Sequence, residues 1–487
     1  MHLRASPGDP GTSRTLTAWT AAVTATGQVV SRASTLLLTA LATAVVTRTI
    51  GEAGFADWGT VLMLFAMVAF VLDPGLAPVV VRRLIQQGDE APSPASLLAV
   101  RLAMAVVAYA GVVGLTVLLR GHQALVLALV LGAQLLPRAV VLNVGTWMQA
   151  EHRLHIQTML ETVTAAGGLV LLVAAAALGA SAPVLAGAGL LAPAIVLAVL
   201  MQRELRRLPH ASARDPGEER RLIRAVLREA APLAGAIVLV SLYTRIGIIF
   251  VNQADDGRVA EFVLAFLFVE QALVVAAIVA ATLLPMLGDR VSPHRAGPVE
   301  QDLLVGVTTL GAFGALLLIA LAEPLVLLLG GSELKGAAPV LTLLAPACAA
   351  IFGNVFVAYL FVAARRSPLY LAYSLVGLAI SVALGFALTL QHGAEGAARA
   401  TWITELVVVT LAAVPYFGRS GPARQAVLTM VAAVAMAVAA SELAADGAVA
   451  PVPAALLAGA LLAAVTASRM HRLVGHVRLA RAPSGQR

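Results

Sequence analysis

The chain has 487 residues, of which 60% are hydrophobic and only 12% charged, and its mean hydropathy is +0.91. This composition excludes a soluble enzyme or binding domain, because a soluble chain of this length needs far more polar surface. The net charge of +7 does not indicate a nucleic-acid partner, since the arginines are spread over short loops without interleaved aromatic residues. The sequence therefore predicts an all-α polytopic membrane protein.

The first 27 residues are polar and lack the apolar segment and cleavage site of a signal peptide. We expect residues 1–27 to be a flexible cytoplasmic tail. The single cysteine, Cys348, lies within an apolar run, which excludes an intrachain disulfide and makes a thiolate metal site implausible. No metal site and no cofactor are expected.

Windows of about 19 residues indicate fourteen transmembrane helices. The expected spans are 29–48, 58–81, 95–118, 123–148, 158–179, 182–202, 230–251, 260–286, 303–322, 338–363, 368–390, 398–417, 424–441 and 451–470.

Charge placement predicts the orientation. With the N-terminus inside, the cytoplasmic segments carry most of the arginines, whereas the outer loops hold only Arg120, Arg258, Lys335 and Arg399. The positive-inside rule then places both termini in the cytoplasm. Because the outer loops are short, they leave no room for an extracytoplasmic catalytic domain.

The predicted domains follow from these spans. Residues 28–202 form an N-lobe of six helices, 203–229 a basic cytoplasmic linker, and 230–418 a C-lobe of six helices. Residues 419–470 add two C-terminal helices, and 471–487 form a basic cytoplasmic tail. We expect the linker to begin as a loop and to end as a basic amphipathic helix.

The two lobes resemble each other at an offset of about 210 residues. NVGTWMQAEHRLHIQTMLETV, which begins at Asn143, aligns with NVFVAYLFVAARRSPLYLAYSLV, which begins at Asn354. Because each half has an even number of spans, the repeats are parallel, which is an architecture of transporters with the substrate between the halves. A repeat alone would also suit a channel or a scaffold.

Several blocks carry a family resemblance. TRTIGEAGFADWGTVLMLFAMVAFVLDPGLAPVVVRRL resembles the opening of the polysaccharide and oligosaccharide-lipid flippases of the MOP (multidrug/oligosaccharidyl-lipid/polysaccharide) exporter superfamily. The matching positions are Gly51, Glu52, Gly54, Asp73, Gly75, Leu76 and Arg82. Later blocks, among them SLYTRIGIIFVN, LLPMLGDR and GAEGAARATWITELVVV, are similar as well.

The resemblance implies two pseudo-symmetric six-helix lobes around a central cavity, plus two C-terminal helices. It implies a flippase that moves a polyprenyl-pyrophosphate-linked oligosaccharide from the inner to the outer leaflet of the cell membrane by alternating access. The chain departs from the family at Gly247, where relatives often carry an aspartate, and at the pair Phe266 and Leu267, where an aromatic residue followed by an arginine is usual and the arginine is missing. The early block typical of lipid II flippases is missing, which favours the lipid-linked oligosaccharide branch.

Polar residues at helical spacing form three stripes within the spans. They are Gln28, Arg32, Thr35, Thr39, Thr43 and Thr47 in the first span, Gln134, Arg138, Gly145 and Gln149 in the fourth, and Ser241, Arg245 and Asn252 in the seventh. An arginine at the bilayer centre costs roughly +2.5 to +3.5 kcal/mol on insertion scales, so these stripes predict a shared water-filled cavity that binds substrate. The alternative for Arg32 and Arg245 is snorkelling to the headgroups.

Three intramembrane acids, Asp73, Glu270 and Glu405, are candidates for ion coupling to a proton or sodium gradient, and structural ion pairing is the alternative. From helix rise, Glu270 and Arg245 differ in depth by only ~6 Å, which a long arginine side chain can bridge. Guanidinium groups bind phosphate bidentately, as a pyrophosphate-linked substrate requires.

No enzyme motif is present, so we expect a transporter that works as a monomer among membrane lipids, with the lipid-linked sugar as its partner. The alternatives are a lipid II flippase or cation-coupled multidrug exporter of the same superfamily. A non-transporting lipid-binding scaffold and a polysaccharide polymerase or ligase are alternatives from other classes.

Overall fold

The computed structural model describes residues 10–73, 75–86, 91–151, 153–207, 215–287, 297–364, 366–417 and 421–481. These residues contain no β-strand, and ten helical segments among them are long and apolar enough to cross a membrane. The chain is therefore a multi-pass, all-helical membrane protein, as its composition predicts.

The helices before the linker form one group, in the order α1 (Pro10–Ala69), η1 (Phe70–Leu72), α2 (Leu76–Gln86), α3 (Pro94–Arg120), η3 (Gly121–Ala124), α4 (Leu125–Gly132), α5 (Leu135–Ala150), α6 (Leu154–Ala177), α7 (Ala182–Ala186), η4 (Gly187–Leu191) and α8 (Ala192–Leu205). Within this group α6 packs on α1 and α8, and α5 packs on α3 and α8.

The helices after the linker are α9 (Pro216–Arg245), α10 (Gly247–Ala254), η5 (Asp256–Arg258), α11 (Val259–Leu287), α12 (Pro298–Ala320), α13 (Ala322–Gly330), α14 (Ala337–Leu344), α15 (Pro346–Ala363), α16 (Ser367–Phe417), α17 (Gly421–Ala445) and α18 (Pro451–Arg481). In this second group α16 packs on α9 and α15, and α12 packs on α15, α17 and α18.

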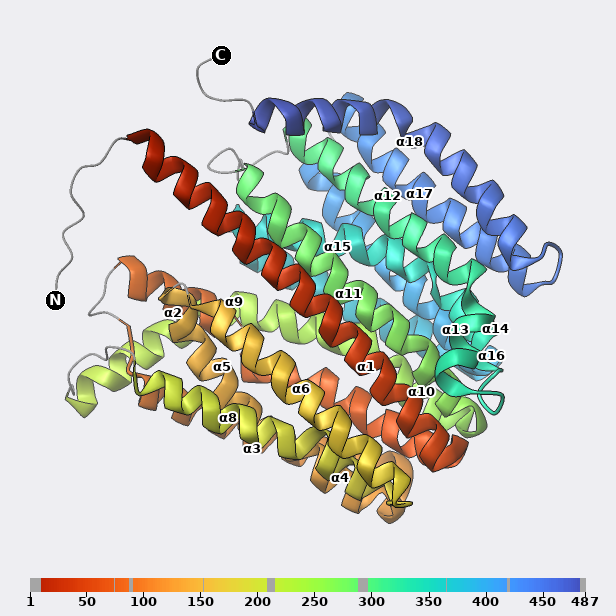
Figure 1. Cartoon of the computed structure of the whole chain (residues 1–487). Coiled ribbons are helices and arrows are strands. Elements are labelled where there is room, and N and C mark those ends of the chain that lie inside the picture. The colour runs from red at the N-terminus through yellow and green to blue at the C-terminus, as the bar shows by residue number, and fades with distance from the viewer. Residues whose placement is uncertain are drawn as a thin grey trace.

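Figure 1 shows the first group on one side of the molecule and α11 to α18 on the other, with α1 between them. α1 packs on α9, α11 and α13, and α2 packs on α9, so these helices form the interface between the groups. The packing is tightest where Gly59 of α1 meets α11, because a Cβ on Gly59 would overlap the side chain of Val263.

Two of the longest helices contain a glycine joint. Gly51 in α1 has φ 66° and Gly393 in α16 has φ 57°, values in the left-handed region that favours glycine. Each joint lies between two predicted spans, where the chain has to reverse. The fourteen predicted spans fall mainly on helices, and the second, 58–81, is interrupted at Asp73. Their number as membrane crossings and the N-in orientation stay predictions.

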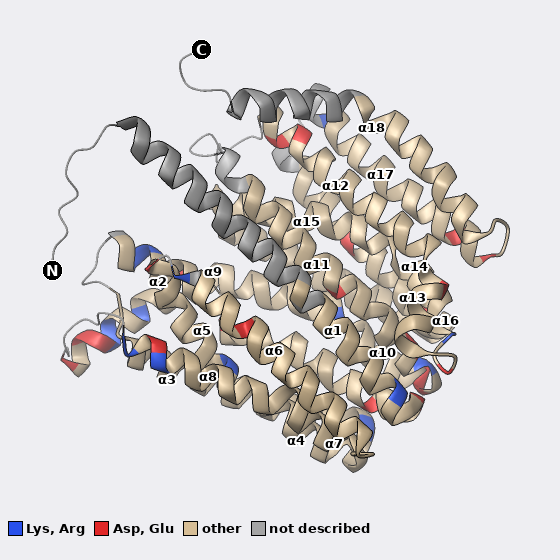
Figure 2. Cartoon of the chain, viewed as in Figure 1, with Lys and Arg blue, Asp and Glu red and all other residues tan. Residues whose placement is uncertain are grey.

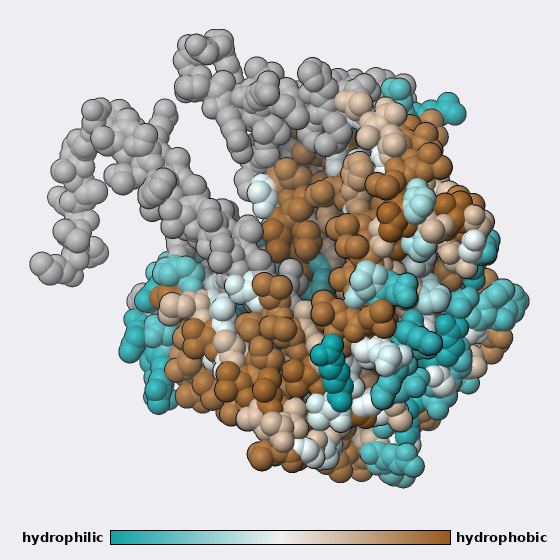
Figure 3. Space-filling model, turned by 45° about the vertical axis from the view of Figure 1, so that its right-hand side comes forward, coloured by the Kyte–Doolittle hydropathy of each residue, from teal (hydrophilic) through white to brown (hydrophobic). Residues whose placement is uncertain are grey.

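The surface has the distribution that a bilayer requires. Figure 3 shows a broad hydrophobic band between hydrophilic patches at opposite edges of the molecule. Large apolar side chains are highly exposed within the spans, including Val107 at 71%, Leu118 at 77% and Leu456 at 69%. Figure 2 shows that most charged residues of the described chain lie at the helix ends, with few in the middle. The exposed apolar band is therefore the lipid-facing surface.

The predicted linker helix is present and has no break before the membrane. α9 begins at Pro216, where the side chain of Asp215 accepts a hydrogen bond from the amide of Gly217, and it continues to Arg245. The basic end of the linker and the first part of the seventh predicted span are therefore one helix.

Candidate functional site

A cavity of about 430 Å³ lies among α9, α11, α15 and α16 and is closed on one side by Phe70 and Asp73 from the first helix group. Its walls are mainly apolar and aromatic, with tyrosines at 243, 359, 370 and 373. The polar groups that line it are Asp73, Ser241, Thr244, Arg245, Asn354, Ser374 and Glu405. The cavity thus draws on both helix groups, although most of its wall belongs to the second.

Arg245 lies at the end of α9 and is 5% exposed. Its Nε donates to Oε1 of Glu270 on α11 at 2.8 Å, and its Nη1 donates to Oγ of Ser241 at 3.3 Å. The guanidinium also lies 5.6 Å from the ring centroid of Phe70, within range of a cation–π interaction. The predicted approach of Arg245 to Glu270 is confirmed, and Arg245 turns inward to the cavity.

Ser241 connects the two helix groups. It lies one helical turn before Arg245, and its hydroxyl donates to the carbonyl oxygen of Met67 in α1 at 3.0 Å. This hydrogen bond therefore fixes the part of α9 that lines the cavity to the end of α1, shortly before Asp73.

Asp73 interrupts the helix between η1 and α2 with φ −142° and ψ 65°. Its Oδ1 accepts a hydrogen bond from the amide of Ala77 at 2.9 Å, which satisfies a free donor in the first turn of α2. The same oxygen lies 3.1 Å from Nη2 of Arg101. Asp73 therefore both caps α2 and pairs with a buried cation.

Arg101 of α3 is a functional candidate that the sequence analysis missed. It is completely buried, and its two terminal nitrogens lie 3.1 Å from the hydroxyl of Thr146, with Asn143 Oδ1 at 3.4 Å from Nη1. The signal was available, because Arg101 is the only charged residue of an otherwise apolar predicted span. The argument applied to Arg245 also applies to this position.

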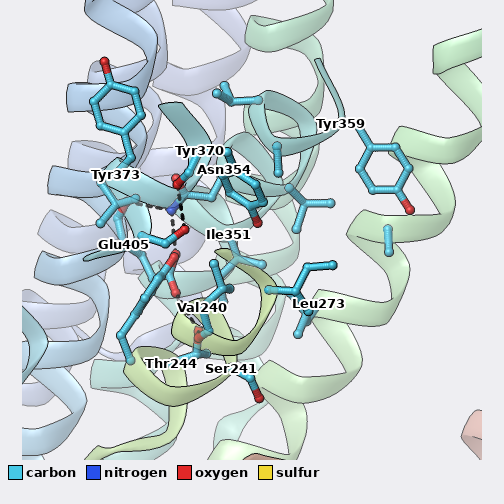
Figure 4. A pocket seen from close by; sticks show the side chains of 18 of the residues that line it. Val240, Ser241, Thr244, Leu273, Ile351, Asn354, Tyr359, Tyr370, Tyr373 and Glu405 are labelled. Carbon is cyan, nitrogen blue, oxygen red and sulfur yellow. Dashed lines mark hydrogen bonds between the residues drawn. The ribbon is translucent and has the colours of Figure 1, made fainter. Parts of the chain in front are cut away.

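Glu405 of α16 is 2% exposed and has no basic side chain within salt-bridge distance among the described residues. Its Oε2 accepts from Nδ2 of Asn354 at 2.5 Å, and its Oε1 accepts from the hydroxyl of Thr244 at 3.4 Å. Figure 4 shows these three side chains meeting at the cavity wall, close to Tyr370. The carboxyl group is thus held by neutral donors in an apolar surrounding.

The cavity does not include the other predicted substrate residues that are described. Gln134 lies at the break between α4 and α5, where its side chain donates to the carbonyl oxygen of Leu131 at 3.1 Å. Arg138 is exposed on α5 and Thr39 is exposed on α1. The side chains of Arg32 and Thr35 lie outside the described residues. Of the predicted site, Asp73, Ser241, Arg245 and Glu405 are brought together, with Glu270 behind Arg245.

The threonines of the first stripe bond to backbone. The hydroxyl of Thr43 donates to the carbonyl oxygen of Thr39 at 2.9 Å, and that of Thr47 donates to Leu329 O in α13 at 2.5 Å. A bond to a backbone carbonyl oxygen satisfies the hydroxyl donor without any ligand. The stripe thus contributes at its end to contact between the helix groups.

Polar contacts between the groups gather at the end of the bundle that holds Arg120, which we name the Arg120 end. Arg120 Nε donates to Asp57 Oδ1 at 2.7 Å, and its Nη1 contacts Asp256 of the second group. Deeper at this end, Asn252 of α10 donates to the hydroxyl of Thr60 at 3.2 Å. The groups are therefore joined by side-chain bonds at the Arg120 end.

At the opposite end the groups meet through α2 and α9. Arg83 Nη2 lies 2.9 Å from Oε2 of Glu229, and Arg82 contacts the other oxygen of the same carboxylate. These side chains are partly exposed, so the pairs are screened by water.

A match to a family profile shows which protein family the chain belongs to. The profile of the family described as polysaccharide biosynthesis protein matches residues 21–290, which is more than half of the chain. The chain belongs to the polysaccharide biosynthesis protein family. The matched region includes α1 to α8 and continues through α9 and α11, so it contains Asp73, Ser241, Arg245 and Glu270.

Solved structures of MOP transporters share the fold. The lipid II flippase MurJ in an inward closed conformation aligns with a TM-score of 0.66 and 13% identity, over 92% of this chain and 98% of that chain. An inward-facing multidrug resistance MATE family transporter of the MOP superfamily aligns with a TM-score of 0.58 and 15% identity, over 83% and 98%. The eukaryotic MATE transporter AtDTX14 aligns with a TM-score of 0.51, 12% identity and 83% and 97% coverage.

These likenesses concern the fold, which the chain shares with a multidrug transporter of the MOP superfamily and with MurJ. No curated protein sequence matches the chain significantly.

Proposed function

We propose that this protein is a flippase that moves a polyprenyl-pyrophosphate-linked oligosaccharide from the inner to the outer leaflet of the cell membrane by alternating access. The observation that carries the proposal is the cavity at the interface of the helix groups, which is lined by a buried arginine, an amide and four tyrosines in a chain of the polysaccharide biosynthesis family. In this proposal the protein is a transporter, not an enzyme, and works as a monomer.

The cavity suits a sugar-phosphate head. Its 430 Å³ is within the range of small-molecule sites, roughly 300–1,000 Å³. Tyrosine offers an apolar ring face and a hydroxyl in one side chain, which suits the mixed apolar and hydroxylated faces of a sugar. Asn354 and Thr244 add neutral donors at the same wall. The apolar remainder of the wall suits the first isoprene units of the lipid.

Arg245 supplies the phosphate contact in this proposal. Its charge is balanced by Glu270 in the structure, and that of Asp73 is balanced by Arg101. The described cavity is therefore not strongly cationic, and a pyrophosphate would have to replace Glu270 as the partner of the guanidinium. Such an exchange keeps Arg245 paired at every stage, and the carboxylate of Glu270, whose side chain is 20% exposed, would then have to bind water or a proton.

Helix lengths support the proposal of fourteen crossings, and the orientation with both termini inside rests on the charge distribution. The segment from Ser367 to Val414 has 48 residues, which at 1.5 Å per residue gives ~72 Å, more than twice the ~30 Å of a hydrocarbon core. The joints at Gly51 and Gly393 divide such helices into two crossings each. In this orientation the Arg120 end is the outer end, and its contacts hold the outer side of the cavity closed.

Glu405 is our candidate for coupling to a proton or sodium gradient. Asp73 and Glu270 each have an arginine partner, whereas Glu405 is buried with neutral donors alone. A carboxyl group in that setting gains most from binding a proton or a cation.

The second candidate function is multidrug export, because an unpaired acid and aromatic walls also suit an organic cation. Proteoliposomes distinguish the two. We expect the wild-type protein to make an inside-labelled polyprenyl-pyrophosphate sugar accessible to an outside glycosidase, and Arg245→Ala to abolish this. Arg206→Ala, an exposed arginine at the end of α8, is the matched control and keeps the wild-type rate. Gradient-driven uptake of a cationic dye without sugar translocation contradicts the proposal.

A further inference from the structure

The start of α9 carries four arginines that form no ion pair within the described residues. Arg220, Arg221, Arg224 and Arg228 are all exposed and precede the apolar part of the helix. At 3.6 residues per turn they fall within a sector of about 100°. We name this sector the arginine arc.

The other faces of the same helix are fastened to the first helix group. Val226 and Ala230 are buried in a cluster with Trp147 of α5 and Leu205 of α8. The acids are engaged as well, because Glu219 Oε1 accepts from the amide of Ser93 at 2.5 Å and Glu229 pairs with Arg82 and Arg83. Packing therefore fixes the rotation of α9 and leaves the arginine arc as an outward-facing cationic strip.

The depth of the arc matches a headgroup layer. Arg228 lies two residues before Ala230, where the apolar part of α9 begins, and Arg220 lies eight residues earlier, ~12 Å along the helix. The polar layer of each leaflet is about 5–8 Å thick, so Arg228, ~3 Å before Ala230, lies within it and Arg224, ~9 Å before Ala230, lies at its outer edge. Arg220 and Arg221 lie just beyond, within the ~10 Å over which the surface potential acts at 0.1 M salt. Figure 2 shows charged residues gathered at this end of the molecule.

We propose that the arginine arc is a docking surface for anionic phospholipid headgroups of the leaflet at which α9 begins. The arc has the charge, exposure and depth for diester phosphates, and α9 has no acid of its own left to neutralise it apart from Glu218. The same helix, α9, carries the arc at its start and Ser241, Thr244 and Arg245 of the cavity wall at its end. This surface needs no transported substrate and is independent of the function proposed above.

The test uses the full-length protein in nanodiscs and measures the preference for spin-labelled phosphatidylglycerol over spin-labelled phosphatidylcholine by electron paramagnetic resonance. A basic residue near a membrane surface contributes about 1 kcal/mol, so we expect each arginine removed to lower the preference about fivefold. Arg220→Gln/Arg224→Gln should lower it strongly, and Arg220→Lys/Arg224→Lys should keep it. Raising the salt to 1 M should weaken the wild-type preference to the level of the double Gln variant.

The matched control is Arg203→Gln/Arg206→Gln, which removes the same charge from two exposed arginines at the end of α8. The control should keep the wild-type preference. If it lowers the preference as much as the variant in the arc does, the attraction is a general property of this surface and the proposal is wrong. A wild-type preference in Arg220→Gln/Arg224→Gln also overturns it. All four side chains are exposed, so the variants should fold, and thermal unfolding of each checks this.

Discussion

The pair of Arg245 and Glu270 gives the sharpest prediction, because Arg245 is buried and Glu270, its ion-pair partner, is mostly so. In Glu270→Gln the guanidinium of Arg245 keeps Ser241 Oγ and the ring of Phe70 but loses the carboxylate that lies within salt-bridge distance of it among the described residues. Breaking a buried ion pair from one side costs about 3–5 kcal/mol. We expect ~3 kcal/mol, the lower end of that range, because 20% of the Glu270 side chain is exposed and water can reach it.

A double-mutant cycle separates pairing from packing. Arg245→Gln/Glu270→Gln leaves no buried charge at the pair, so it should be more stable than Glu270→Gln alone, with a coupling free energy above ~1.5 kcal/mol. The assay is unfolding by titration with a denaturing detergent in mixed micelles, followed by circular dichroism. If the two single changes add within ~0.5 kcal/mol, the pair does not stabilise the fold and our reasoning about it is wrong.

Three further predictions follow from the interface and the cavity. Arg120→Gln should change the unfolding free energy by less than ~1 kcal/mol, because its partners are partly exposed, but should widen the spin-label distance between the groups at the Arg120 end. Gly59→Val should destabilise by about 1–3 kcal/mol through overpacking against Val263, measured by the same detergent titration, and Val263→Ala should restore part of the loss. Glu405→Gln should keep the fold and remove the dependence of transport on the ion gradient, measured with and without the gradient in proteoliposomes.

Each of these three predictions has a result that would contradict it. An unchanged distance distribution in Arg120→Gln would show that other contacts close that end. If Gly59→Val has wild-type stability, the helices at this point are farther apart than described. Transport by Glu405→Gln that still follows the gradient assigns coupling to another group. A spin-label pair at the end of the bundle opposite the Arg120 end, near Glu229, serves as the control for the distance measurement.

Sequence patterns predicted a side-chain contact well where the depth of the two residues along their helices decides whether they can meet. The helix rise placed Arg245 and Glu270 at nearly the same level, and the two side chains lie 2.8 Å apart. Apolar runs and turns predicted the helices and the basic start of α9. Periodicity shows which residues share a face of one helix, but it does not show what that face contacts.

In the first stripe the hydroxyls of Thr43 and Thr47 bond to backbone, while the substrate role predicted for Arg32, Thr35 and Thr39 stays a prediction. Arg101 and Asp73 meet because α2 begins at a helix break next to α3, and no local pattern specifies that distance. The contacts of Arg120 were missed because loop charges were assigned to topology alone. Packing between distant helices decided these parts of the site.

Translocation by the purified protein tests the central claim most directly. Full-length protein and the Arg245→Ala variant are reconstituted in vesicles that carry a polyprenyl-pyrophosphate-linked sugar in the inner leaflet, and its appearance in the outer leaflet is followed with an outside glycosidase. We predict translocation by the wild-type protein and none by Arg245→Ala when both are equally folded. Equal translocation by both proteins, or none by either, contradicts the account.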